Sequence, residues 1–300
     1  MVPLLRDAGL SALVAGEAAV ETLADGLEFT EGPLGLPDGS LLFQDIKAER
    51  TYRIPPGGGP ARVLRERTRA ANGQTFGPDG LVYFCEQNGR RVSRMAPDGS
   101  AVAPVVETWQ GRRLNSPNDI VAHPRGTLYF TDPPYGLPRP EDREIPFQGV
   151  YALETSGDLR LVTSEDFEKP NGLAFSPDGR TLYVCDTAKY HVRAFAVADD
   201  GSVAPDSGRV FATMDPGQPG GPDGMKVDRD GRVYIAVALG VWVYEPDGRL
   251  LGILSLPKRP ANLAWWGPDG RALAITAGDT VYRVELNVAG LTPPFLPVTR

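Results

Sequence analysis

The stretch FSPDGRTLYVCDT (175–187) decides the fold, because two apolar runs flank one tight turn. Its Pro-Asp-Gly tripeptide is typical of a turn in which glycine adopts a positive φ. The residues after the turn are rich in Leu, Tyr and Val, a composition that favours strands. The stretch therefore predicts a β-hairpin.

The same template occurs five more times. The further copies are GLPDGSLLFQDI (35–46), FGPDGLVYFCEQ (76–87), AHPRGTLYFTDP (122–133), VDRDGRVYIAV (227–237) and WGPDGRALAIT (266–276). Their turn glycines lie 39 to 53 residues apart, and a second strand pair fits between successive copies. About four strands in 40 to 50 residues is the period of a propeller blade. We therefore predict an all-β fold, a six-bladed β-propeller with four-stranded blades, and the regular period argues against a sandwich.

The last repeat lacks one strand. Only TVYRVEL (280–286) follows the sixth hairpin, so we expect AVETLADGL (19–27) to supply the outer strand and to close the ring without a free edge. The predicted organisation is an N-terminal arm (1–18), formed by a short helix or loose chain, one propeller domain (19–290) and a C-terminal tail (291–300).

Composition excludes several classes of protein. The net charge of −7 and the pI near 5.0 argue against nucleic-acid binding and mildly favour cation binding. The sequence has no apolar run of membrane-spanning length, and charged residues interrupt the apolar N-terminus, so we expect a cytoplasmic monomer or small homo-oligomer. Cys85 and Cys185 form no CxxC pair, which argues against a disulfide framework and a thiolate zinc site. We expect His123 to be solvent-exposed in a turn and His191 to be structural at a strand start, which argues against a serine triad.

A ring of polar residues emerges from the repeat. The residues eight positions before the turn glycines are Glu31, Asn72, Asn118, Asn171, Asp223 and Asn262. Strand propensity does not explain them, because Asn and Asp are depleted in strands. Equivalent positions in a propeller lie on a circle around the axis. We therefore expect these six residues, called the polar ring below, to converge at one mouth of the central channel.

Convergent oxygen donors suit a hard cation. Four members of the polar ring sit in similar short motifs that contain Pro, which are TEGP (30–33), SPND (116–119), KPNG (169–172) and GPDG (221–224). Two of these four are acidic, which matches one divalent ion. Calcium fits best because it accepts carboxamides; Mg, Mn and Zn are alternatives, although zinc favours His or Cys. A structural role, in which the ring caps strands and binds channel water, is the competing interpretation. Asn72 and Asn262 lack the flanking Pro, so we assign them to outer or substrate-facing positions.

Acidic residues end several of the strands that follow the turns. The six strand ends are Asp45, Glu86, Asp132, Asp186, Val237 and Thr276. We expect Asp45 and Glu86 to bind backbone amides or Arg side chains. Asp132 and Asp186 are candidates for orienting ligands or water. The insertion DPPYGLPRPEDREIPFQG (132–149) is predicted to be a loop that walls this mouth, with Tyr135 facing a substrate.

Together these motifs resemble the senescence-marker-protein/gluconolactonase/luciferin-regenerating-enzyme-like family, and its bacterial gluconolactonase branch above all. The stretch RLNSPND…FTDPPYG is the most specific, and the likeness runs from about residue 20 to 286. The resemblance implies one catalytic divalent metal held by Glu31, Asn118, Asn171 and Asp223. It also implies that Asn72 contacts substrate or water. Some animal relatives carry an Arg two residues before that Asn; here Ala70 occupies this place and Arg69 beside it is the candidate contact.

The favoured function is hydrolysis of a gluconolactone-like sugar lactone to its aldonic acid. The metal would polarise the carbonyl and stabilise the oxyanion. Calcium acidifies water weakly, so a carboxylate is needed as general base, and Asp223 is the first choice. Its own blade carries Val237, and no acid, at the end of the next strand. The alternatives are a metal-dependent phosphotriesterase on the same site and a non-catalytic propeller scaffold that binds proteins.

Overall fold

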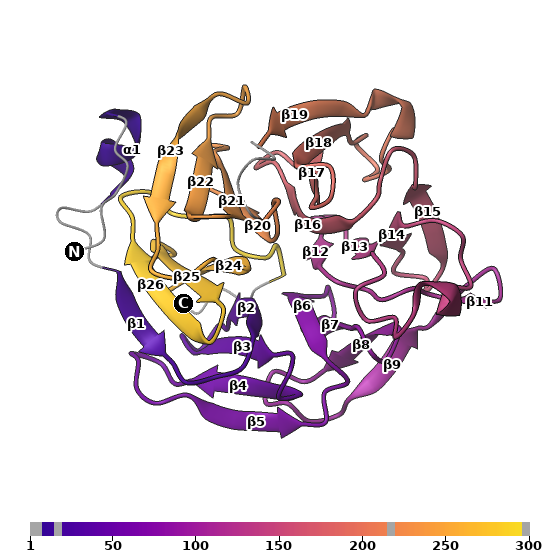
Figure 1. Ribbon diagram of the computed structural model, residues 1–300, viewed down its shortest axis with the longest axis horizontal. Helices are drawn as coiled ribbons and strands as arrows, with labels where there is room; N and C mark the ends of the chain where they lie inside the picture. The colour runs from indigo at the N-terminus through magenta and orange to yellow at the C-terminus, as the bar shows by residue number, and fades with distance from the viewer. Residues whose placement is uncertain (1–7, 15–19, 215–219, 296–300) are drawn as a thin grey trace.

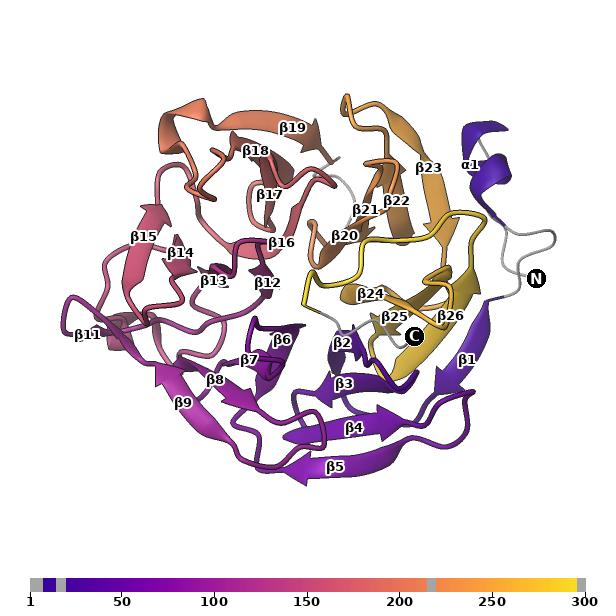
Figure 2. The same ribbon diagram turned by 180° about the vertical axis from the view of Figure 1, so that it is seen from behind.

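The computed structural model describes residues 8–14, 20–214 and 220–295, which form six four-stranded antiparallel sheets around a central axis (Figure 1). Each sheet is one blade, and its first strand lies nearest the axis in both views (Figures 1 and 2). The predicted six-bladed β-propeller is therefore confirmed.

The blades follow the chain in order. Blade one contains β2 (Thr30–Gly35), β3 (Leu41–Asp45), β4 (Arg50–Ile54) and β5 (Arg62–Glu66). Blade two contains β6 (Ala71–Phe76), β7 (Val82–Glu86), β8 (Arg91–Met95) and β9 (Ala103–Val106). Blade three contains β12 (Ile120–Ala122), β13 (Leu128–Asp132), β14 (Gly149–Leu153) and β15 (Leu159–Thr163). A small hairpin of β10 (Thr108–Trp109) and β11 (Arg112–Arg113) precedes blade three.

The second half repeats this order. Blade four contains β16 (Pro170–Phe175), β17 (Thr181–Asp186), β18 (His191–Ala196) and β19 (Arg209–Thr213). Blade five contains β20 (Met225–Val227), β21 (Val233–Val237), β22 (Gly240–Tyr244) and β23 (Leu250–Ser255). Blade six contains β24 (Asn262–Trp266), β25 (Ala272–Ala277) and β26 (Thr280–Glu285). The short helices are α1 (Ala8–Leu13), η1 (Pro140–Asp142) and η2 (Pro205–Ser207).

The N-terminal strand closes blade six, as predicted. β1 (Glu21–Ala24) pairs antiparallel with β26, with Glu21 opposite Arg283. Ala19, the first residue of the predicted strand, lies outside the described residues. Before this strand, α1 buries Leu10 in the apolar core of blades five and six. The described part of the predicted arm is thus packed on the propeller. Within the described ranges, no helix is long and apolar enough to cross a membrane.

The core lies between the blades, where aromatic side chains from neighbouring sheets meet. Tyr234 and Trp265 pack edge to face with ring centroids 5.1 Å apart. His123 belongs to this packing, and the expectation that it is solvent-exposed is wrong. It is 5% exposed, its ring lies 4.9 Å from Phe175, and its Nε2 lies 3.3 Å from the carbonyl oxygen of Gly179. The turn that holds His123 is covered by blade four, a contact that no local pattern reports.

The chain after β26 returns to the axis, where Figure 2 shows it passing blade five. The Leu291 N–H donates to the Val227 carbonyl at 3.0 Å, and Phe295 packs against the cores of blades one to three. The described start of the predicted tail therefore bridges opposite sides of the propeller. Residues 296–300 of that tail lie outside the described residues.

Candidate active site

The polar ring assembles at one end of the channel, because its members occupy equivalent places at the starts of the innermost strands. Glu31, Asn72, Asn171 and Asn262 lie in the first or second position of β2, β6, β16 and β24. Asn118 and Asp223 lie two residues before β12 and β20. The pKa of the Glu31 carboxyl is raised by the charge of Asp223 and lowered by a hydrogen bond with Asn262 of the neighbouring blade six, so the three side chains face the same space.

Irregular strand pairing aims these side chains. Asn118 N–H donates to the Thr131 carbonyl at 2.9 Å, while Thr131 N–H donates to the Asp119 carbonyl at 3.0 Å. Two consecutive residues therefore face one partner, which is the arrangement of a β-bulge. Asp223 and Gly224 face Ala236 in the same way, at 2.9 Å for both bonds. The register also shifts just after Glu31, Ala71 and Pro170. A bulge turns side chains out of the normal alternation, here toward the axis.

Glycines bring neighbouring ring members together. Four of the six polar ring residues are followed by Gly. An ideal Cβ built on any of these four glycines would lie only 2.0–2.3 Å from an atom of the next blade. The closest atoms are Asn72 O for Gly32, Asp119 Oδ1 for Gly73, Asp223 O for Gly172 and Asn262 Oδ1 for Gly224. No other residue permits this approach, because any side chain would collide with the backbone or side-chain atoms of the adjacent blade.

The electrostatics of the ring favour a cation. Five members are 2–4% exposed, whereas Asp223 is half-buried. Burial, and then the charge of Asp223, raises the pKa of the Glu31 carboxyl well above its usual value. Burial raises the pKa of Asp223 to about 7, although the positive charge of Arg259 and a hydrogen bond from Asn171 lower it. Two carboxylates share a poorly solvated space, so a positive charge between them would stabilise both.

Sequence reasoning missed Asp119. It is 2% exposed, its Oδ1 accepts the Ile120 N–H at 2.9 Å, and its negative charge raises the pKa of both Glu31 and Asp223. The sequence does distinguish Asp119, because it is the one acid among the six residues that directly follow ring members. Asp119 therefore adds a third carboxyl group next to the two acids of the polar ring.

Three acidic strand ends hold the chain segments that lead into the ring. Each carboxylate accepts N–H groups from the residues two and three positions before a ring member, at 2.6–3.1 Å. The pairs are Asp45 with Glu28 and Phe29, Asp132 with Asn115 and Ser116, and Asp186 with Glu168 and Lys169. Glu86 instead pairs with Arg91 of its own blade at 2.5 Å. Asp132 and Asp186 thus hold the backbone that leads to Asn118 and Asn171.

The insertion of blade three reaches the ring. Tyr135 Oη accepts a hydrogen bond from Asn171 Nδ2 at 3.4 Å, and Lys169 Nζ lies 5.8 Å from the centre of the Tyr135 ring. Tyr135 is 40% exposed and lines an open hollow of about 580 Å³ together with Arg90 and Arg113. Arg69 is exposed in a left-handed conformation (φ 57°) three residues before the ring member of blade two. Their substrate contacts stay predictions.

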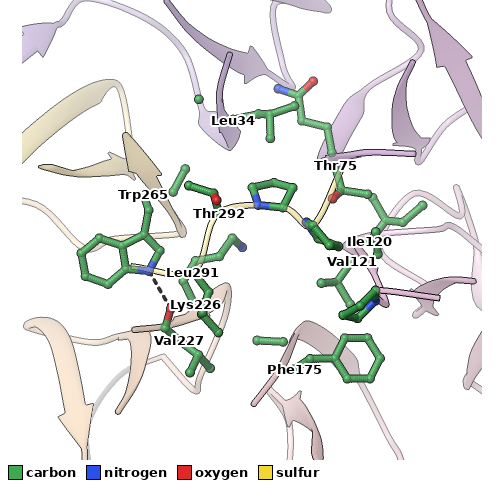
Figure 3. Close-up of a pocket in the computed structure, with 18 of the residues that line it drawn as sticks. Leu34, Thr75, Ile120, Val121, Phe175, Lys226, Val227, Trp265, Leu291 and Thr292 are labelled. Atoms are coloured by element: carbon green, nitrogen blue, oxygen red, sulfur yellow. Dashed lines mark hydrogen bonds between the residues drawn. The ribbon is translucent and has the colours of Figure 1, made fainter. Parts of the chain in front are cut away.

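A separate cavity lies farther along the channel (Figure 3). It measures about 190 Å³ and is lined by all six innermost strands, at positions two or more residues beyond the ring members. Leu291 and Thr292 close it, and the Trp265 indole N–H donates to the Val227 carbonyl at 2.9 Å beside them. Its walls are mostly apolar, so the ionisable chemistry belongs to the ring mouth and not to this cavity.

A six-bladed propeller with an oxygen-lined channel mouth is the class of protein that the fold and the ring define. The family model described as SMP-30/Gluconolactonase/LRE-like region matches residues 29–279, and the chain belongs to this family. A gluconolactonase of Zymomonas mobilis is 30% identical, over 94% of this chain and 85% of the relative. A pentonolactonase of Haloferax volcanii is 29% identical, over 82% and 80%.

Solved structures agree. A gluconolactonase from Xanthomonas campestris shares 33% identity and superposes with a TM-score of 0.86, covering 95% of each chain. A regucalcin from Agrobacterium tumefaciens, described as a calcium-binding protein, superposes with a TM-score of 0.78 over 93% of this chain and 98% of its own. At 19% identity, the second likeness shows the shared fold alone.

Proposed function

We propose that this protein hydrolyses a sugar lactone to the aldonic acid at the polar ring. The observation that carries the proposal is the convergence of two acids and four carboxamides at one channel mouth, in a chain 30% identical to a gluconolactonase over most of its length. We further propose that Glu31, Asn118, Asn171 and Asp223 hold one divalent cation, with calcium as the best match.

The residues present fit such a cation. Within the polar ring, Asn72 Oδ1 is buried without a hydrogen-bond partner, so an oxygen is free to accept a cation or a polar ligand. Burial is the main cause of the raised pKa values of Glu31 and Asp223, so a cation beside these poorly solvated carboxyl groups would stabilise their charged forms. In the described part of the chain, no three His, Cys, Asp or Glu side chains are grouped as a metal site. Carboxamides would therefore have to complete the ligand set, which calcium tolerates better than zinc does.

The chemistry divides between the cation and the chain. When bound, the cation would supply Lewis acidity toward the lactone carbonyl oxygen. Asp223 is the half-buried acid of the ring, so its carboxylate can reach a water molecule and take the proton as that water attacks. Asn72, Tyr135 and Arg69 surround the same mouth and would bind the hydroxyl groups of the sugar. The buried Asn262 and the backbone anchors Asp132 and Asp186 would keep the ligands in place.

The test combines metal exchange with a substrate panel. Chelator-treated protein is assayed with hexonolactones, pentonolactones and one phosphotriester, after addition of Ca, Mg, Mn or Zn in turn. We expect calcium to restore lactone hydrolysis. Turnover of the phosphotriester alone would assign the ring to phosphotriester hydrolysis instead. Failure of every cation to support any hydrolysis would refute the proposal and favour a binding scaffold.

A further inference from the structure

We propose that Thr187 is a positioning residue that sets the orientation of the Asn171 carboxamide. This inference rests on the proposed cation site and adds a residue outside the polar ring to it. Thr187 follows β17 directly, and its N–H donates to the Lys169 carbonyl at 3.0 Å. Its hydroxyl lies between two chain segments that carry ring members.

The direction of each hydrogen bond follows from a single fixed acceptor. The Thr187 hydroxyl lies 2.7 Å from the carbonyl oxygen of Pro222, which can only accept, so the hydroxyl proton is committed to Pro222. Thr187 Oγ1 can then only accept from its second neighbour, the Asn171 amide at 3.0 Å. The group facing Thr187 is therefore the NH2 of Asn171. Its Oδ1 must occupy the other side of the carboxamide, away from Thr187 and available as a cation ligand.

A flipped Asn171 would be penalised at this contact. After the flip, Asn171 Oδ1 would face Thr187 Oγ1 at about hydrogen-bond distance, and neither oxygen would have a proton to donate to the other. The NH2 group would then occupy the position that a ligand oxygen needs. Tyr135 favours the same orientation. Its hydroxyl hydrogen-bonds with Thr187, which can only accept, so Tyr135 donates there and its oxygen accepts from Asn171 Nδ2 at 3.4 Å.

The same contact ties two ring members together. Pro222 precedes Asp223, and Gly221 approaches so closely that an ideal Cβ would lie 2.0 Å from the Thr187 carbonyl oxygen. Gly172 N–H also donates to the Asp223 carbonyl at 3.2 Å. Thr187 is thus placed to hold the amide of one ring member against the backbone of the other.

Thr187→Val tests this role, because it keeps the side-chain shape and removes the hydroxyl. We expect the calcium Kd, measured by calorimetric titration of metal-free protein, to rise about tenfold, as is usual when the partner of a metal ligand is lost. Thr187→Ser keeps the hydroxyl and should bind calcium within about threefold of the unaltered protein. Thr127→Val, a change of the same kind at a buried Thr in the turn that holds His123, is the matched control and should also stay within about threefold. Thermal unfolding without calcium shows that each variant is folded.

A double-mutant cycle separates orientation from general stability. In Asn171→Asp both side-chain oxygens can ligate, so orientation no longer matters, and adding Thr187→Val should not weaken calcium binding further. An equal loss in both backgrounds, or no loss in the Thr187→Val single variant, would overturn the inference while leaving the cation site intact. Absence of calcium binding by the unaltered protein would instead refute the cation site of the proposed function, and the inference with it.

Discussion

Replacing Gly172 by Ala tests whether close approach of the innermost strands builds the ring. An ideal Cβ at Gly172 would lie 2.3 Å from Asp223 O, 2.7 Å from Gly224 Cα and 2.8 Å from Met225 N. All three are backbone atoms, so no side chain can move aside. An ordinary C···O contact is about 3.3 Å or longer, so the strands must separate by about 1 Å.

Separating the strands lowers the free energy of unfolding, and two opposing effects set the size of this change. Overpacking a tightly packed site costs about 1–3 kcal/mol. Ala also has less conformational freedom than Gly in the unfolded chain, which stabilises the folded protein by about 0.4–1 kcal/mol. The net loss of about 1–2 kcal/mol should lower Tm by about 2–3 °C in a chain of this size. Because the shift separates Asn171 from Asp223, we also expect the calcium Kd to rise about tenfold or more.

The assay pairs thermal unfolding with calcium titration, and Gly80→Ala is the control. Gly80 has a φ of 76° and no atom within 4 Å of an ideal Cβ, so Ala there costs backbone strain without touching the ring. The control should lose about 1 kcal/mol of stability and keep its calcium affinity. A Gly172→Ala protein with unchanged Tm and Kd would refute the reasoning.

Three further predictions concern charge, catalysis and closure. Glu31→Gln removes one of two ring charges and should raise the calcium Kd about tenfold or more, whereas exposed Glu28→Gln should not; equal titration curves would contradict the ligand role. Asp223→Asn keeps an amide oxygen but cannot take a proton, so lactone turnover should fall about a hundredfold or more with part of the calcium retained. Asp247→Asn, in an exposed turn, is its control, and near-normal turnover of calcium-loaded Asp223→Asn would move the base role to another group. Deleting residues 1–24 removes β1 and leaves the β26 edge unpaired, so Tm should drop and light scattering should rise on heating; an equally stable truncated protein would show that closure is dispensable.

Local sequence was sufficient for the blades and for the members of the ring. Turn glycines such as Gly179 and the strands around them depend on residues a few positions apart, and their repetition fixes the blade number and the shared place of the polar residues. The missing outer strand was also predictable, because a propeller cannot leave one blade incomplete without exposing an edge.

Only the tertiary structure decided what happens between blades. His123 was predicted to be exposed, yet blade four covers it, and no pattern near His123 contains that contact. Asp119 stands beside a predicted ligand, but its burial among ring carboxyls depends on where the other blades place theirs. Thr187 contacts Asn171 and Pro222 across separations of 16 and 35 residues. The sequence by itself determined the repeating unit and the chemistry at each repeat, because both are local. The contacts that aim those groups arise only when separate strands meet around one axis.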